Sequence, residues 1–251
     1  MQRYFIPEAN WEIDEVLITG QDAHHISRVM RKKIGDFVIC NHPNGKAAKC
    51  QLAVIDKQTV KAKIIEWIND TSELPIHVTI AQGLPKGDKI EYVLQKGTEL
   101  GAKEFIVYNA DHTIVRWDHK KTEKKIHRFN KIVKEASEQS RRNNIPYIHP
   151  LANIDYLVEK SNGYDVKIFA YEDEAKTNQF HSLANELRRL QVNGRLFACI
   201  GPEGGFSEQE VHILKSIGFA PVRLGPRILR TETAALYLLS SISYHFEELG
   251  C

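Results

Sequence analysis

The sequence contains few cysteines and spaces them widely. Cys40, Cys50, Cys199 and Cys251 form no CxxC pair, and no histidine cluster accompanies them, so neither a zinc site nor a disulfide framework is indicated. This usage predicts a reduced, cytoplasmic chain that holds no metal.

Long apolar runs are also missing. No stretch approaches the roughly 20 apolar residues that span a bilayer, and the first residues, MQRYFIPEANW, lack the apolar core of a secretory signal. The sequence therefore predicts a soluble protein with no membrane partner.

Neither sign of charge dominates the chain. Lys and Arg number 34 against 32 for Asp and Glu, so any surface for a polyanion has to be a local patch. The strongest basic stretch runs from Arg116 to Arg142, with ten basic and four acidic residues, and ends in SRRNN. Such a helix is more often a solvated face than a phosphate site, and both interpretations stay open.

Residues 1–72 alternate short β-type runs with turns. The runs YFI, EVLIT, DFVICN, KAAKCQLAVI and TVKAKIIEWI predict a small β domain. One helix, for which Asp22 is the expected cap, interrupts them and places His25, Arg28 and either Arg31 or Lys32 along one side. This cationic face fits either RNA contact or simple solvation.

The pattern changes after the polar stretch TSELP at 71–75. From there to residue 251 strands and helices alternate, with expected strands at 76–82, 104–110 and 166–172 and expected helices at 88–101, 119–140 and 178–190. The sequence thus predicts an α/β domain over 73–251, with a mostly parallel sheet covered on both faces.

Two glycine-proline turns organise the last quarter of the chain. IGPEGGFSEQEV at 200–211 and LGPRILRTETAAL at 224–236 each follow an apolar run and precede a helix, for which Ser207 and Thr231 are the expected caps. We expect the turns side by side at the carboxyl ends of neighbouring strands, where open α/β sheets bind ligands.

The turns do not match the common phosphate motifs. Their spacing is neither GxGxxG nor GxxxxGK[ST], and a proline in the turn removes an N–H donor. A single such turn is more often structural. Two turns, the second followed by the polar cluster RTET at 230–233, favour a site for an adenine edge or a ribose.

Five blocks of this sequence resemble one family. The two turns, together with HHISRVMR at 24–31, KGDKIEYVLQKGTELG at 86–101 and EQSRRNNIP at 138–146, resemble the ribosomal RNA small subunit methyltransferase E family of the SPOUT superfamily. The resemblance implies a PUA-like β-barrel followed by a SPOUT domain with a deep C-terminal trefoil knot. It also implies a homodimer that uses S-adenosylmethionine to methylate N3 of one uridine in 16S ribosomal RNA, near the decoding centre of the small subunit.

The resemblance also assigns residues. The cofactor would be held by Ile200, Gly201, Glu203, Gly204, Leu224, Gly225, Ile228, Leu229, Arg230, Thr231 and Thr233. The catalytic candidates are Arg230, Arg142 and Glu232, and the RNA-binding candidates are Arg3, His25, Arg28, Arg31, Lys86, Lys89 and Arg141.

The proposed chemistry explains these residue types. Uracil N3 carries a proton, so the site must remove it or stabilise negative charge on the ring oxygens, which is the role expected of Arg230. Glu203 and Glu232 suit either a base or, preferably, the orientation of an arginine. Competing hypotheses are a SPOUT enzyme acting on another RNA atom and a ribosome-assembly factor without turnover. A dehydrogenase is less favoured because its glycine fingerprint is missing.

Overall fold

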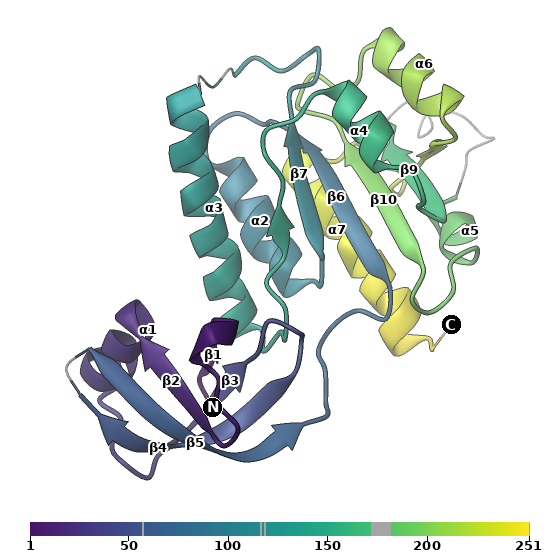
Figure 1. Cartoon of the computed structure of the whole chain (residues 1–251). Helices are drawn as coiled ribbons and strands as arrows, with labels where there is room; N and C mark the ends of the chain where they lie inside the picture. Colours follow the sequence, from purple (N-terminus) through teal and green to yellow (C-terminus); the bar gives the residue numbers. More distant parts are fainter. Residues whose placement is uncertain (57, 116, 118, 172–181, 251) are drawn as a thin grey trace. The chain divides into compact units, whose positions relative to one another are not determined.

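The chain folds into two compact units. The computed structural model describes residues 1–56, 58–115, 117, 119–171 and 182–250 (Figure 1). The first unit comprises Met1–Glu73 and Ser137–Ile145, and the second comprises Leu74–Ala136 and Pro146–Cys251. Each unit has its own buried apolar cluster, which is the physical criterion for an independent core.

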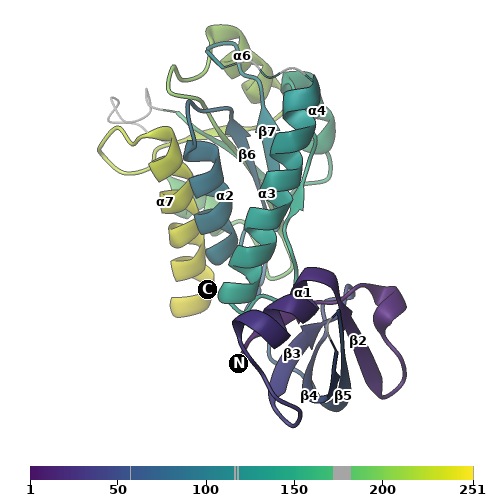
Figure 2. The ribbon, with the colours of Figure 1, turned by 90° about the vertical axis from the view of Figure 1, so that its left-hand side faces the viewer.

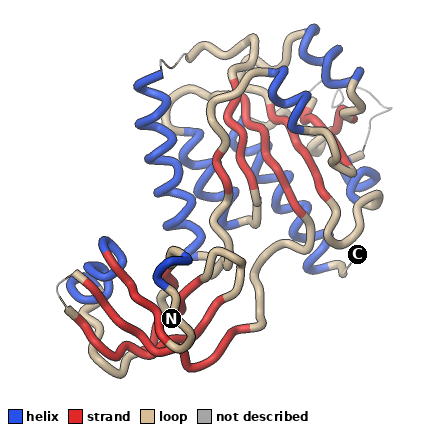
Figure 3. Tube along the Cα trace, viewed as in Figure 1, coloured by secondary structure: helices blue, strands red, loops and turns tan. Residues whose placement is uncertain are grey.

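The first unit is built on a curled five-stranded sheet (Figure 3). Its strands are β1 (Arg3–Phe5), β2 (Glu15–Thr19), β3 (Phe37–Asn41), β4 (Ala47–Ile55) and β5 (Thr59–Ile68), in the order β1-β3-β4-β5-β2. Only β1 and β3 pair in parallel. Two register shifts between β4 and β5 bend the sheet, and all five predicted strands are confirmed.

Short helical segments connect β2 to β3. They are α1 (Gly20–His24) and the continuous π-helical turn η2 (His25–Val29), while a 3-10 turn, η1 (Glu8–Asn10), follows β1. The expected cap Asp22 is wrong: Thr19 occupies the N-cap position and Asp22 lies within the first turn of α1. The helix starts earlier because Gly20, at φ 61°, lets the chain turn directly out of β2.

A second segment, 137–145, completes the first unit. Glu73 binds it from the end of the first segment: its Oε2 accepts from Arg142 Nη2 at 2.5 Å. Its Oε1 accepts from the backbone N–H groups of Asn143 and Asn144 at 3.0 and 3.1 Å. Sequence patterns did not predict this return of the chain, because it depends on one carboxylate meeting residues about seventy positions away.

The second unit contains a six-stranded sheet in which every pairing is parallel. Its strands are β6 (His77–Gly83), β7 (Glu104–Tyr108), β8 (Tyr147–Ile148), β9 (Val166–Ala170), β10 (Arg195–Ile200) and β11 (Ala220–Val222), in the order β11-β9-β10-β6-β7-β8. This arrangement confirms the predicted parallel α/β fold.

Helices cover both faces of this sheet. One face packs against α2 (Lys89–Glu99), α7 (Thr231–Ser243) and the part of α3 (His119–Gln139) that ends at residue 136 (Figure 2). The short helix α5 (Leu183–Leu187) packs against the same core. The other face packs against α4 (Ile154–Lys160) and α6 (Glu208–Ser216), and the π-helical turn η4 (Tyr244–Glu248) follows α7. The sequence patterns missed α4 and β8, which are both short. Part of the predicted helix 178–190 lies outside the described residues.

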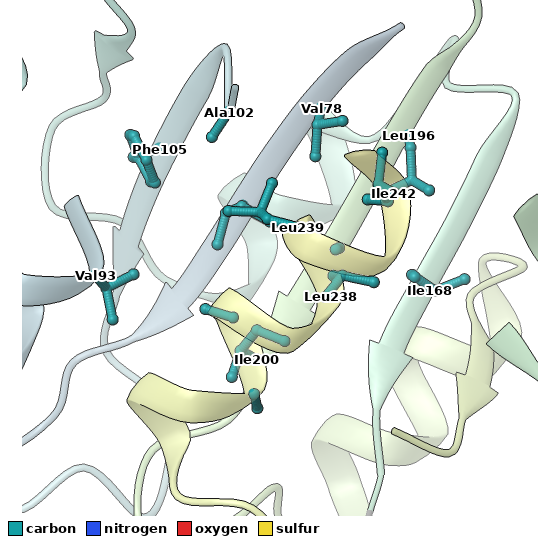
Figure 4. Close-up of a cluster of buried hydrophobic side chains, with 14 of the residues drawn as sticks. Val78, Val93, Ala102, Phe105, Ile168, Leu196, Ile200, Leu238, Leu239 and Ile242 are labelled. Atoms are coloured by element: carbon teal, nitrogen blue, oxygen red, sulfur yellow. The ribbon is translucent and has the colours of Figure 1, made fainter. Parts of the chain in front are cut away.

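Strand β10 shows how the two layers arise. Its side chains alternate, so that Leu196, Ala198 and Ile200 enter the core under α7, while Phe197 and Cys199 enter the opposite core. Figure 4 shows Leu196 and Ile200 beside Leu238, Leu239 and Ile242 of α7. Fully burying each such Leu or Ile side chain contributes roughly 1.5–3 kcal/mol. This packing fixes the amino end of α7 near the carboxyl end of β10.

Within the described part of the chain, no helix combines the length and apolar character needed to cross a membrane.

Candidate functional site

A cavity of about 450 Å³ opens at the carboxyl ends of β9, β10 and β11. The loop 201–207 and the loop 223–230 both line it, as expected. The expectation of neighbouring strands is wrong, because β9 lies between β10 and β11 in the sheet. The cavity accordingly includes Ala170 and Tyr171, from the end of β9, which the sequence patterns did not single out.

The first loop is tied to the start of α7. Thr231 Oγ1 donates to the carbonyl of Gly201 at 2.6 Å and accepts from Gln82 Nε2 at 2.7 Å. Thr231 is buried and begins α7, whereas Arg230 is the N-cap residue, so the expected capping role of Thr231 is wrong. Its hydroxyl instead joins the ends of β6, β10 and α7.

Further contacts fix the other side of the loop. The predicted capping box at the start of α6 is present: Ser207 Oγ accepts from the backbone N–H of Glu210, and the Glu210 carboxylate accepts from the N–H of Ser207. Glu210 also accepts from the N–H of Asp111. His112 Nδ1 lies 2.9 Å from the carbonyl oxygen of Gly204. Contacts with Thr231, Glu210 and His112 therefore fix the loop in the absence of a ligand.

Two glycines permit a close backbone approach at the cavity. A Cβ atom on Gly83 would lie 2.7 Å from the backbone nitrogen of Pro202, and one on Gly204 would lie 2.8 Å from His112 Cβ. Any side chain at either position would displace loop 201–207. Glycine is required at both positions for this steric reason.

The second loop turns at a residue that favours glycine. Gly225 has φ 77°, and Arg223 Nε donates to its carbonyl at 2.9 Å. This turn brings the side chains of Leu224 and Leu229 to the cavity wall, where they supply apolar surface. The cavity thus combines apolar walls with exposed loop backbone.

A lysine joins two carboxylates beside the cavity. Lys89 Nζ lies 2.7 Å from Glu203 Oε1 and 3.5 Å from Glu232 Oε2. Partial burial raises the pKa of Glu203, but the hydrogen bonds from Lys89 and from the backbone N–H of Lys86 outweigh it, so this pKa is lowered. The hydrogen bond to Glu203 is the main cause that raises the pKa of Lys89. Both shifts favour the charged forms of Lys89 and Glu203, so this pair is ionised at neutral pH.

Most residues assigned to the cofactor lie together at the cavity. The lining residues include Ile200, Gly201, Glu203, Gly204, Leu224, Gly225, Ile228, Leu229, Arg230 and Thr231. Thr233 is exposed on α7 and does not line it. Lys89, which the sequence suggested as an RNA contact, does line it, and so does Arg227, which the sequence analysis did not single out.

The three catalytic candidates are in different environments. Arg230 is exposed and lines the cavity, and Glu232 does not line it but lies beside Lys89. Arg142 is 1% exposed and bonded to Glu73 in the first unit. Because its guanidinium is buried and bonded to Glu73, the structure argues against the catalytic role expected of Arg142.

The RNA-binding candidates also differ in exposure. Arg28, Arg31, Lys86 and Arg141 are exposed, and Arg31 and Arg141 adopt positive φ angles of 50° and 63°. Arg3, by contrast, is buried and its Nη1 binds the amide oxygens of Asn41 and Asn143, while His25 Nδ1 lies 3.0 Å from Tyr4 Oη. Arg3 is therefore placed to hold asparagine side chains rather than phosphates.

No group of three or more His, Cys, Asp or Glu side chains suited to a metal ion occurs among the described residues.

Two family profiles match the chain. One described as an RNA methyltransferase domain matches residues 72–243, and one described as an RNA methyltransferase PUA domain matches residues 18–65. These matches fall on the second and first units respectively.

Individual proteins extend the likeness to the full length. The chain is 45% identical over 252 residues to ribosomal RNA small subunit methyltransferase E of Bacillus subtilis, covering 99% of this chain and 98% of the relative.

Solved structures agree with this likeness. The structure of ribosomal RNA small subunit methyltransferase E from Neisseria gonorrhoeae, bound to S-adenosyl methionine, is 29% identical with a TM-score of 0.85, covering 98% of both chains. A putative methyltransferase from Legionella pneumophila in complex with the same cofactor is 27% identical with a TM-score of 0.82, covering 97% of both. The chain, with its PUA-like unit and its cavity between two Gly-Pro loops, therefore belongs to the ribosomal RNA small subunit methyltransferase E family.

Proposed function

We propose that this protein uses S-adenosylmethionine to methylate N3 of one uridine of 16S ribosomal RNA near the decoding centre of the small subunit. The observation that carries the proposal is the cavity that both Gly-Pro loops line, in a chain of this family. When bound, the cofactor supplies a methyl group activated by a sulfonium.

The residues of the cavity fit this cofactor. A volume of about 450 Å³ lies in the range of roughly 300–1,000 Å³ typical of small-molecule sites. Leu224 and Leu229 offer apolar surface for an adenine ring, and loops 201–207 and 223–230 offer backbone groups for its polar edge. Glu203 supplies a carboxylate for a cationic amino group. These residues would hold the cofactor.

The substrate side of the site requires charge stabilisation. Arg230 is exposed at the cavity, so its guanidinium can meet the negative charge that develops on the uracil oxygens as the N3 proton leaves. Glu232 orients Lys89, because their atoms are 3.5 Å apart and Lys89 also holds Glu203. We leave Arg142 out of the chemical step because Glu73 occupies its guanidinium.

Reaching N3 requires an unpaired or flipped base, because the reacting edge is the Watson–Crick edge. Exposed cations on both units support RNA contact: Arg28, Arg31 and Arg141 on the first and Lys86 on the second. The domains are proposed to be an RNA-binding module over 1–72 and a catalytic module over 73–251, acting in the cytoplasm on the ribosomal subunit.

A homodimer and a trefoil knot complete the proposal. Exposed Tyr237, Tyr244 and Leu249 line a cavity of about 590 Å³ beside α7, which supports pairing of two copies there. For the knot, support comes from the position of Thr231, which follows the edge strand β11 yet is bonded to Gly201 and Gln82 at the ends of central strands.

The proposal is tested by incubating the purified protein with unmethylated small subunits and labelled S-adenosylmethionine. Mass spectrometry then locates the modified nucleotide. We expect a single methyl group on N3 of one uridine in 16S RNA. Methylation of another atom would point to a different SPOUT activity, and binding to subunits without cofactor uptake would point to an assembly factor.

A further inference from the structure

A stacked aromatic pair, Trp11 and Trp67, lies on the first unit, with Trp67 exposed and Trp11 partly buried. Trp67 of β5 stacks on Trp11 with ring centroids 5.5 Å apart and an interplanar angle of 19°. One face of the Trp67 ring is therefore covered by Trp11, yet the residue is 47% exposed. Its other face is available to solvent.

The pair is held rigidly in place. Trp11 Nε1 donates to the carbonyl of Ile6 at 3.2 Å, and its ring meets His42 edge-on at 5.1 Å. Trp67 is paired in the sheet with Ala48, whose small side chain is fully buried. A preorganised indole loses little entropy when a second flat ring stacks on it.

A small cavity adjoins this aromatic pair. It has a volume of about 340 Å³, and His42 and Ile6, which both contact Trp11, line it. The remaining lining residues combine apolar and amide side chains: Phe5, Pro7, Asn41, Pro43, Asn143, Asn144 and Ile145.

Two amides that line this cavity, those of Asn143 and Asn144, suit hydrogen bonding to a base, whereas both amide atoms of Asn41 are already bonded to Arg3 and Arg142. Arg3 Nη1 binds Asn143 Oδ1 at 2.5 Å, which directs the other amide atom of that side chain, Nδ2, away from Arg3. Asn144 is fixed through its backbone N–H by Glu73, and its side-chain amide makes no hydrogen bond within the described part of the chain. Asn side chains can donate and accept at once, as the edge of a nucleobase requires.

Two exposed cations lie within a few residues of the lining residues in the sequence. Arg141 precedes the segment that supplies Asn143 and Asn144, is exposed, and forms no ion pair among the described residues. Lys46, close in sequence to His42 and Ala48, is also exposed. Exposed cations near the cavity in sequence favour a partner that carries phosphate groups over an apolar one.

We propose that Trp67 and the asparagine-lined cavity bind unpaired nucleotides of one single-stranded RNA, one base stacking on Trp67 and another entering the cavity. This inference rests on the proposed function in one respect, that the substrate is RNA. A stacking surface, amide groups and adjacent cations together match single-stranded nucleic acid, which is recognised by stacking, base-edge hydrogen bonds and phosphate contacts. A protein partner would leave the cations and amides unexplained.

The test measures binding of the full chain to a fluorescent oligouridylate of about eight nucleotides, a length within the range of single-strand binding modules. Trp67→Ala should weaken binding by roughly 5- to 150-fold, which corresponds to the loss of one stacked base. Trp67→Phe, which keeps a ring, should retain most of the affinity. Asn144→Ala should weaken binding as well.

A matched control comes from the same strand. Ile65 is 50% exposed, so Ile65→Ala removes similar apolar exposure without removing a ring and should leave the affinity unchanged. Photo-crosslinking with 5-iodouridine should join the RNA to Trp67 or His42. Equal affinity of the Trp67→Ala variant and the unmodified chain, or crosslinks confined to other peptides, would overturn the proposal and leave the surface to a protein partner.

The nucleotide site and the proposed function can be tested independently of each other. Trp67→Ala should bind S-adenosylmethionine in calorimetry as well as the unmodified chain does, because Trp67 does not line the cofactor cavity. Loss of oligonucleotide binding with intact cofactor binding supports the nucleotide site. A chain that binds the oligonucleotide through Trp67 but methylates no RNA would overturn the proposed function alone.

Discussion

The hydroxyl of Thr231 donates a 2.6 Å hydrogen bond to the carbonyl of Gly201. The two residues belong to different Gly-Pro segments, and both are buried. Gln82 donates to the same hydroxyl, so one side chain links the start of α7 to the ends of β10 and β6. This link explains how two loops separated in sequence line one cavity.

Replacing Thr231 with Val should weaken both stability and cofactor affinity. The carbonyl of Gly201 and the amide of Gln82 would lose their buried partner, which costs about 1–3 kcal/mol in unfolding free energy. Calorimetric titration with S-adenosylmethionine should show a clear loss of affinity because loop 201–207 is released. Thr231→Ser keeps the hydroxyl and is the control. A Val variant with unchanged affinity would show that the link does not shape the site.

Arg230→Ala should reduce the rate of methylation more than cofactor binding. If its guanidinium stabilises charge on the uracil ring, its loss should lower kcat by about 100- to 1,000-fold. Arg227 also lines the cavity as an exposed cation, so Arg227→Ala is a matched control and should affect kcat much less. Equal losses in the two variants would indicate general electrostatic attraction of RNA instead of a specific role for Arg230.

Glu104 should make the second unit sensitive to acid. It lies 2.6 Å from His149 Nε2 and 2.9 Å from His77 Nε2, and the hydrogen bond from His149 is the main cause that holds the Glu104 pKa well below its ordinary range. A lowered carboxyl pKa stabilises the fold above the unfolded value of about 4.3, and this contribution is lost as the pH falls below that value.

Glu104→Gln should therefore lower the unfolding free energy by about 1.5–3 kcal/mol at pH 7, because it replaces the charge-assisted hydrogen bond to His149 with a neutral one. The difference should shrink on acidification. Glu99→Gln, which removes a more exposed pair with Lys96, is the control and should cost less than about 1 kcal/mol. Denaturant titrations at several pH values measure the unfolding free energy of both variants. A difference between the Glu104→Gln variant and the unmodified chain that does not change with pH would contradict the account.

Arg142→Met should destabilise the first unit without disabling the cofactor site. It leaves the Glu73 carboxylate without its cation, and breaking a buried pair costs about 3–5 kcal/mol. Burial raises the Glu73 pKa, but the hydrogen bond and charge of Arg142 reverse this and lower it, so the loss should appear at neutral pH. Glu73→Gln should have a similar effect. An Arg142→Met variant that is stable and binds cofactor but has lost turnover would support a catalytic role for Arg142.

The sequence predicted the regular parts of the fold well, for identifiable reasons. The alternation of buried side chains along β10 and the apolar stripe of Ile90, Val93 and Leu94 on α2 predict directly which side of each element is buried. The capping box at Ser207 is a local signal and was also found. Each of these features depends on residues close together in the chain.

Long-range contacts were harder to predict. Thr231 resembles a helix cap in sequence, and only its distance from Gly201 and Gln82 shows its role. Lys89 resembles a surface cation until Glu203 and Glu232 are placed beside it. The family resemblance found the loops, but local patterns could not show which polar side chains meet across the sheet.

The central claim is that the two Gly-Pro loops form one cofactor site. Hydrogen exchange of the full chain with and without S-adenosylmethionine tests it most directly. We predict increased protection in both loops, 201–207 and 223–230, with segment 137–145 unchanged. Protection limited to one loop, or found only elsewhere in the chain, would contradict the claim.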